Sequence, residues 1–267
     1  MRFYIYIILL LICSHSASAQ VKCCGSPKLE VRIDSTGNIL SVGTIMNYNP
    51  SSCKIHFDFK VNGKPLVLND SVYENEFGEK YKISKLKYYV SNLHFISWGN
   101  EGSDKNVFLV DASKENTFAI SMPVNPVTGI EFLVGVDSAM NCSGAQSGAL
   151  DPLNDMFWTW NNGYVMFKLE GVSESSNADQ NRIEHHIGGF KGEYKTMRLI
   201  KSVYKEPRTD LREITVSLNL DEYWNSINKI RISEKPVITI PGEDAKKSAD
   251  NFPEMFVIRT LTSLDYK

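Results

Sequence analysis

KIHFDFKVNGKPLVL, at residues 54–68, is the stretch of sequence that decides the fold. Apolar side chains alternate with lysine, histidine and aspartate from Ile55 to Val61, which predicts a β-strand that buries one of its two faces. The Asn62-Gly63 pair that follows is typical of a two-residue hairpin turn. We therefore expect a hairpin that continues into the apolar run at 66–68.

Short β-rich runs recur along the chain at the regular spacing that is typical of a sandwich. They lie at residues 81–97, 107–110, 117–120, 128–136, 164–169, 195–200 and 211–218. The best helical candidate is the short segment 220–227. These runs predict an all-β fold. Because the sequence contains no internal repeat and no linker that would divide the chain, we expect one domain. We expect a single antiparallel β-sandwich over 53–267, with long loops at one end and at most one or two short helices.

The N-terminus has the pattern of a secretory signal peptide at residues 1–19. Arg2 precedes an almost unbroken apolar run, and Ala17-Ser18-Ala19 is a small-residue cleavage site. We therefore expect cleavage near Ala19 and an exported protein, either periplasmic or secreted. Residues 20–52 carry weak patterning and are expected to form an extended leader. The apolar run is too short to cross a bilayer comfortably, and no other segment is long enough, so we predict no membrane span.

Charge and motif content exclude several functional classes. The chain has 29 basic and 31 acidic residues and no dense cluster of lysine and arginine, which argues against nucleic-acid binding. It lacks the serine-hydrolase elbow, the zinc-protease helix, the phosphate-binding loop and the dinucleotide fingerprint, so we do not expect an enzyme. Four carboxylates could form a glycosidase-type pair, but turn capping is the simpler interpretation: Asp137, Asp151, Asp155 and Glu170.

Four cysteines remain after removal of the signal peptide: Cys23, Cys24, Cys53 and Cys142. In an oxidising compartment, an even number of cysteines indicates at least one disulfide, and four allow three connectivities. The adjacent pair Cys23-Cys24 has a second interpretation, as a soft-metal or redox-active dithiol.

The segment 135–190 carries most of the chemistry. Met156, Trp158 and Trp160 alternate, so in an extended strand they share one face. The Asn162-Gly163 pair predicts a tight turn after them. Because tryptophan is large and seldom fully buried, two tryptophans beside a short polar loop suggest the rim of a pocket.

Histidine is the best candidate metal ligand in the same segment. His185 and His186 are adjacent, so in a strand they face opposite sides and only one of them can join a given site. The thiolate of Cys142, the thioether of Met156 and one imidazole would form the ligand set that copper(I) selects.

Several segments together resemble the MbnP-like family of exported β-sandwich proteins, which is named for a copper protein associated with methanobactin. The resemblance runs over about residues 54–260. It is carried by KISKLKYYVSNL (82–93), GIEFLVGVD (129–137), GALDPLNDMFWTWNNGYVMFKLEG (148–171) and HIGGF (186–190). The W-x-W-x-x-G-Y block followed by H-[IL]-G is its most specific part.

The resemblance implies a non-enzymatic role in copper capture, storage or delivery. It implies that His186 is a copper ligand and that Trp158 and Trp160 line the site. It also implies that a diheme peroxidase-like partner oxidises one tryptophan to kynurenine. Relatives tend to have Asn-His where this chain has Asn141-Cys142.

The departure at Cys142 leaves two interpretations open. Cys142 replaces a histidine as a copper(I) ligand, or it is held in a disulfide and the site is lost. His94 is a further candidate imidazole. The alternative function is a metal-free binding or adhesion module that engages a glycan or a protein through aromatic-lined loops.

Overall fold

A computed structural model describes residues 28–33, 39–45, 52–99, 105–159 and 162–262. The predicted signal peptide, Cys23, Cys24 and Trp160 lie outside these residues. The chain divides into two compact units, 1–49 and 50–267. In the first unit, β1 (Lys28–Ile33) and β2 (Ile39–Ile45) pair as an antiparallel hairpin. These strands lie within residues 20–52, for which the sequence predicts an extended leader.

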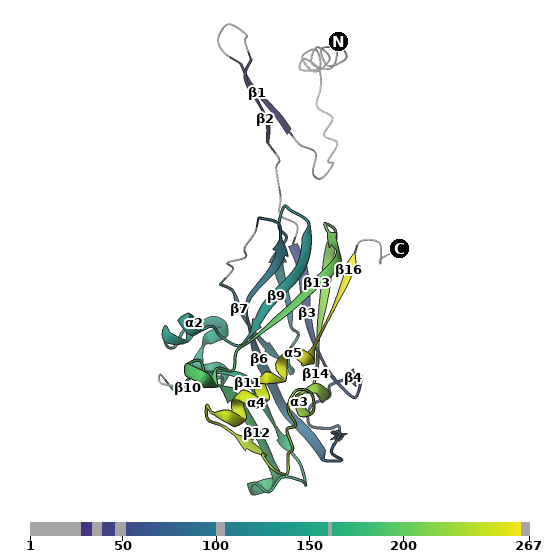
Figure 1. Ribbon diagram of the computed structural model, residues 1–267, viewed down its shortest axis with the longest axis vertical. Helices are drawn as coiled ribbons and strands as arrows, with labels where there is room; N and C mark the ends of the chain where they lie inside the picture. The colour runs from purple at the N-terminus through teal and green to yellow at the C-terminus, as the bar shows by residue number, and fades with distance from the viewer. Residues whose placement is uncertain (1–27, 34–38, 46–51, 100–104, 160–161, 263–267) are drawn as a thin grey trace. The chain divides into compact units, whose positions relative to one another are not determined.

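The larger sheet of the second unit has nine strands in its described residues, with the central order β13-β9-β6-β11-β12-β15 (Figure 1). β10 pairs with β11, and both β5 and β7 pair with β6. The strands are β5 (Tyr73–Glu74), β6 (Lys80–Ser97), β7 (Val107–Asp111), β9 (Val127–Val134), β10 (Phe157–Thr159), β11 (Gly163–Val172), β12 (Arg182–Gly188), β13 (Arg198–Arg208) and β15 (Val237–Ile238).

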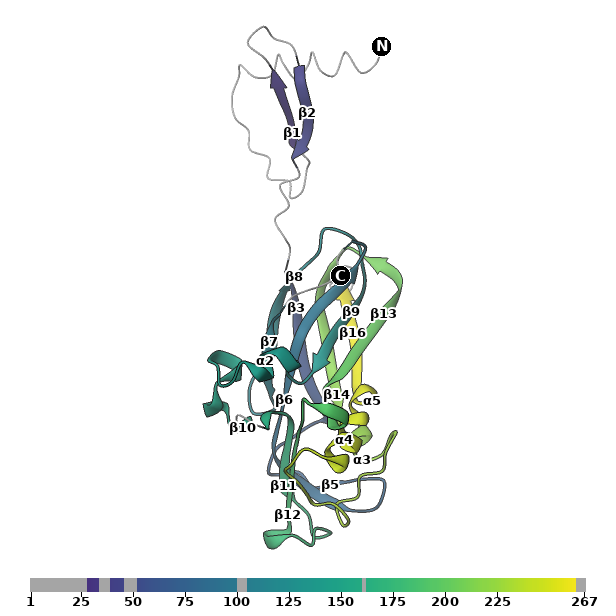
Figure 2. The ribbon, with the colours of Figure 1, turned by 60° about the vertical axis from the view of Figure 1, so that its left-hand side comes forward.

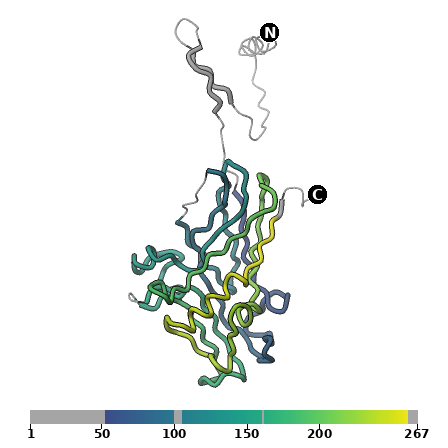
Figure 3. Tube along the Cα trace, viewed as in Figure 1, coloured from purple at the N-terminus to yellow at the C-terminus, as the bar shows by residue number. Residues whose placement is uncertain are grey.

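The smaller sheet has the order β16-β14-β3-β4, with β8 beside β3. Its strands are β3 (Ser52–Val61), β4 (Lys64–Pro65), β8 (Thr117–Ser121), β14 (Leu211–Asn219) and β16 (Phe256–Thr262). β14 lies between β3 and β16, the first and last strands of the unit in its described residues. Figure 3 traces the chain through this unit, with the colour running to yellow at β16. The hairpin predicted at Asn62-Gly63 is confirmed, with Leu66 N–H donating to the Phe59 carbonyl at 2.9 Å.

The predicted all-β, sandwich-like fold is confirmed, and its sheets are mixed because two of the strand pairs are parallel. β14 pairs in parallel with β3, and β12 pairs in parallel with β15. Antiparallel pairing follows naturally when a tight turn joins two strands, whereas a long connection allows either direction. Most of the larger sheet lies in the chain between β3 and β14, so no turn sets their relative direction.

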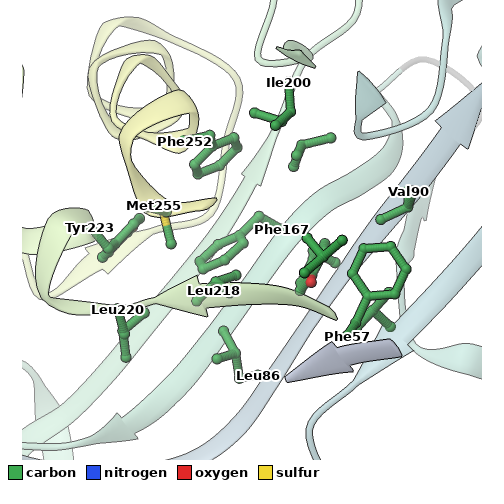
Figure 4. Close-up of a cluster of buried hydrophobic side chains, with 14 of the residues drawn as sticks. Phe57, Leu86, Val90, Phe167, Ile200, Leu218, Leu220, Tyr223, Phe252 and Met255 are labelled. Atoms are coloured by element: carbon green, nitrogen blue, oxygen red, sulfur yellow. The ribbon is translucent and has the colours of Figure 1, made fainter. Parts of the chain in front are cut away.

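Strand alternation builds two separate cores, one on each face of the larger sheet. The main core lies between the two sheets and contains Phe57, Leu86, Phe167 and Leu218 (Figure 4). The second core lies on the opposite face, which we call the outer face. Its buried members are Tyr89, Val136, Leu150, Met156, Tyr164, Val165, Met166 and Phe190.

Four short α-helices lie in the described residues, more than the one or two expected: α2 (Ser138–Cys142), α3 (Asp221–Trp224), α4 (Glu243–Asp250) and α5 (Phe252–Met255). Single-turn 3₁₀ helices occur at Gly148–Leu150, Pro152–Asn154, Asp179–Asn181 and Gly192–Tyr194. The predicted helix near 220–227 is present as α3. Figure 2 shows α2 and β10 on one side of β6 and β11, and α3, α4 and α5 on the other. Among the described residues, no helix is long and apolar enough to cross a membrane.

His185 connects β12 to the segments that cover the main core. Its Nε2 lies 2.7 Å from the Lys235 carbonyl oxygen, which can only accept, so Nε2 carries the hydrogen. Its Nδ1 then accepts a hydrogen bond from the Tyr223 hydroxyl at 2.7 Å. Burial lowers the pKa of His185 to about 4, despite an opposing contribution from the Lys235 carbonyl. The imidazole is therefore neutral in the folded protein at neutral pH.

This environment makes stability depend on pH between about 6.5 and 4. In that range the unfolded chain protonates His185 and the folded chain does not, so acid favours unfolding. From pH 7 to pH 4, we expect the free energy of unfolding to fall by about 3 kcal/mol more in the wild type than in His185→Gln. Urea unfolding at a series of pH values measures the difference, and equal pH slopes for the two proteins would contradict it.

Candidate functional site

The outer face of β11 and its neighbours has an apolar half and a charged half. Near the start of β11, Tyr164 and Met166 belong to the second core. Further along the strand, Lys168 and Glu170 point to the same face and meet charged partners from both neighbouring strands. In the register, Lys168 lies between Lys87 of β6 and His186 of β12. His186, the predicted ligand on β12, therefore lies on the charged half of this face.

Residues 137–159, the covering loop, are shaped by hydrogen bonds from short polar side chains. Asp137 caps α2, because its Oδ1 accepts the Met140 N–H at 2.8 Å. Asp151 caps the 3₁₀ turn at Pro152–Asn154 by accepting the Leu153 N–H at 2.9 Å. Two of the four carboxylates considered for a glycosidase-type pair, Asp137 and Asp151, thus cap turns, whereas Asp155 and Glu170 form ion pairs.

Asn141 joins the covering loop to the start of β11. Its Nδ2 donates to the Val136 carbonyl at 2.6 Å, and its Oδ1 accepts the Tyr164 N–H at 3.0 Å. The Tyr164 hydroxyl in turn donates to the Leu150 carbonyl at 2.8 Å. These bonds hold the loop over the second core.

Asp155, near the C-terminal end of the covering loop, forms ion pairs with lysines on the charged half of the outer face. Its Oδ2 accepts hydrogen bonds from Lys85 Nζ at 2.9 Å and Lys168 Nζ at 3.0 Å. Burial acts to raise the pKa of Asp155, but the hydrogen bonds and charges of the two lysines outweigh it, so the pKa is lowered. Lys168 is only 3% exposed, so Asp155 is the closest counter-charge to a buried ammonium group.

Trp158 lies three residues after Asp155, in the larger sheet. β10, which contains it, pairs with β11, as the Asn162-Gly163 turn predicted. Its ring packs on Gly188: a Cβ added to Gly188 would lie 2.7 Å from Trp158 Cζ3. Gly188 is two residues from His186 on the same face of β12, a separation of about 7 Å. The Trp158 ring therefore contacts β12 two residues from His186, and Met156 is buried in the second core.

His186 lies between two carboxylates. Its Nε2 is 2.8 Å from Glu170 Oε1, and its Nδ1 is 3.8 Å from Glu184 Oε1. The hydrogen bond from His186 lowers the pKa of Glu170 to about 2, with burial opposing it and Lys85 and Lys168 assisting. Because Glu170 is ionised and can only accept, His186 Nε2 carries the hydrogen of this bond, and Nδ1 is the ring nitrogen that faces Glu184.

The other predicted ligands lie elsewhere. His94 is seven residues along β6 from Lys87, and hence about 20 Å from the His186 position. Its Nδ1 lies 2.7 Å from the Asn92 carbonyl and its Nε2 lies 3.9 Å from Glu131. β6 is one continuous strand, so it carries His94 away from the charged half of the face. Within the described ranges, no group of three or more His, Cys, Asp and Glu side chains could hold a metal ion.

Cys142 lies on α2 as an exposed free thiol, and Cys53 is a buried free thiol on β3. Burial, with a smaller contribution from Glu213, raises the pKa of Cys53 to about 12, so this thiol is unreactive. The disulfide candidates Cys23 and Cys24 lie outside the described residues.

Sequence reasoning missed Glu184 and Lys168. The signal for Glu184 was present, because Glu184 and His186 are two residues apart and share a strand face whenever the segment is extended. The signal for Lys168 was absent, because nothing local predicts that a lysine between apolar residues is buried.

We expect Asp155→Asn to destabilise the protein by roughly 1–3 kcal/mol, because Lys168 would remain buried without its closest carboxylate. Urea unfolding measures this effect. Asp179→Asn is a matched control, since Asp179 is exposed and 3.9 Å from Arg182 and should change stability by less than about 0.5 kcal/mol. Equal effects of the two substitutions would contradict the structural role of Asp155.

Gly188→Ala tests the contact with Trp158. The added methyl group would displace the indole ring, and we expect a loss of about 1–3 kcal/mol in stability together with a shift in tryptophan fluorescence. Gly242→Ala is the control, because a Cβ there meets nothing within 4 Å. An unchanged emission spectrum for Gly188→Ala would contradict the packing of Trp158 on Gly188.

Comparison with known proteins agrees with the fold. Among solved structures, MbnP from Methylosinus trichosporium is similar, with 13% sequence identity and a TM-score of 0.54. The match covers 80% of this chain and 100% of that one, and at this identity it shows a shared fold. No curated protein matches the chain. The model of the MbnP family matches residues 50–240, most of the second unit, and the chain therefore belongs to the MbnP family.

Proposed function

We propose that this protein is an exported copper-binding protein that captures, stores or delivers copper without catalysing a reaction. Membership of the MbnP family, which is linked to methanobactin systems, supports this proposal. The signal-peptide pattern at residues 1–19 supports export. The observation that carries the proposal is the His186 imidazole, whose Nε2 is hydrogen-bonded to Glu170 and which lies two residues along β12 from the glycine that contacts Trp158.

The donor chemistry at His186 suits copper. Histidine ligands of metals commonly donate their second ring N–H to a carboxylate, which fixes the tautomer and the ring orientation. Glu170 accepts such a bond from Nε2 at 2.8 Å, so Nδ1 would be the atom that holds the ion. The ring is also protected, because the side chain of His186 is only 13% exposed.

Trp158 is the described tryptophan on which a modifying partner would act. Its indole contacts Gly188, two residues along β12 from His186, which supports this proposal. A diheme peroxidase-like partner, implied by the family resemblance, would have to reach this ring or that of Trp160. Cys142 is exposed and available as an additional soft ligand during copper capture.

Metal analysis of the protein purified from its own compartment tests the proposal. We expect near-stoichiometric copper in the wild type, with none in His186→Ala. His56→Ala is the matched control, because His56 contacts Thr117 on the smaller sheet and should leave copper content unchanged. Loss of copper in both variants would contradict a site at His186. No copper in the wild type, even after incubation with copper, would instead favour the metal-free binding module.

A further inference from the structure

The β1–β2 hairpin is a sheet of only two strands in the part of the chain that the structure describes. β2 pairs with one edge of β1, with Val31 opposite Val42, and the other edge of β1 has no strand partner within the described residues. A two-stranded sheet is only marginally stable in water, and the unpaired backbone groups of an edge are a template for another strand. A further strand at the free edge of β1 would therefore stabilise the hairpin.

The sequence of this edge strand is complementary to itself in the antiparallel direction. β1 and the residue that follows it read KLEVRID, at residues 28–34. If two copies of this segment pair antiparallel about Val31, oppositely charged positions face each other and apolar positions face each other. The opposed residues are Lys28 with Asp34, Leu29 with Ile33 and Glu30 with Arg32, and each pair occurs twice. Pairs of these kinds, directly opposite each other on two strands, stabilise a sheet.

Charge selects this register over its neighbours. A shift of two residues in one direction places Glu30 opposite itself, and the same shift in the other direction places Arg32 opposite itself. Like charges directly opposite each other are destabilising. A shift of one residue brings apolar positions opposite charged positions, because the two faces of a strand alternate. Parallel in-register pairing also places every charged residue opposite its own copy.

The charged residues of β1 have no charged partner across the hairpin itself. Glu30 lies opposite Gly43 and Arg32 lies opposite Ser41. β2 reads ILSVGTI and contains no charged residue. The alternating charges of β1 therefore form no cross-strand ion pair within one hairpin, whereas antiparallel pairing of two copies matches every charged residue from 28 to 34.

We propose that β1 is a homodimerisation strand, through which two copies of this protein pair antiparallel about Val31. The two hairpins then form one four-stranded sheet in the order β2-β1-β1-β2. A two-fold contact of this kind uses the same strand in both copies, so it closes at a dimer. The expected cleavage near Ala19 leaves β1 in the mature chain. Because the family match begins at residue 50, the interface lies outside the MbnP domain and does not depend on copper.

Analytical ultracentrifugation of the full mature chain tests the proposal. We expect a monomer–dimer equilibrium in the wild type. Glu30→Arg and Arg32→Glu should each weaken the dimer by about tenfold or more, because each substitution creates two like-charge pairs across the interface. Glu206→Arg is the matched control: it makes the same charge change as Glu30→Arg at an exposed position of β13, and it should leave the equilibrium unchanged.

Restored complementarity distinguishes strand pairing from general damage to the hairpin. The double variant Glu30→Arg/Arg32→Glu again places arginine opposite glutamate, and so does an equimolar mixture of the two single variants. We expect both samples to dimerise as the wild type does, with circular dichroism establishing that every variant is folded. A wild type that stays monomeric, single variants that dimerise like the wild type, or a mixture that remains monomeric would each overturn the proposal. None of these outcomes bears on copper binding.

Discussion

Burial of β11 on both faces is the constraint on which the rest of this structure depends. Alternate residues of the strand enter different cores, so Phe167 packs between the sheets while Met166 packs on the outer face. A strand of this kind requires cover on both sides, because exposed apolar surface is unfavourable in water. The smaller sheet and α3, α4 and α5 cover one side, and the covering loop covers the other. Lys168 is buried because the covering loop extends over it, and Asp155 supplies the carboxylate that makes this burial tolerable.

The same alternation separates the two adjacent histidines into different roles. His185 faces the main core, where Tyr223 and Lys235 satisfy both ring nitrogens and burial keeps the ring neutral. His186 faces outward, where Nε2 is hydrogen-bonded to Glu170 and Nδ1 lies 3.8 Å from Glu184 Oε1. A shift of one residue in the register of β12 would exchange the two environments. The hydrogen bonds of His185 therefore also hold His186 in its position on the outer face.

Local pattern in the sequence was sufficient for the fold class and for much of the strand content. The alternation from Ile55 to Val61 and the Asn62-Gly63 turn both correspond to observed structure, as do the β10–β11 hairpin and the separation of His185 from His186. Pairing between strands that are far apart in the sequence could not be predicted from local pattern. No local feature indicates that β14 lies parallel to β3, because their pairing depends on how the whole chain closes. α4 was missed for a different reason: it has only eight residues, and its buried face of small residues, such as Ala245 and Ala249, gives little apolar periodicity.

For the candidate site, the sequence suggested sulfur neighbours for His186, whereas the described side chains that reach its ring are carboxylates. Proximity along the chain suggested sulfur ligands from Cys142 and Met156, yet Cys142 lies on α2 and Met156 is enclosed in the second core. The atoms that reach His186 come from its own strand and from β11, at positions set by cross-strand register. Register is a property of the assembled sheet, so a carboxylate on β11 can meet a histidine on β12 that is 16 residues away.

This placement also joins the site to the covering loop, since Lys85 contacts both Glu170 and Asp155. The ion pairs of Asp155, three residues before Trp158, are thus continuous through Lys85 with those of Glu170, which accepts the hydrogen bond from His186.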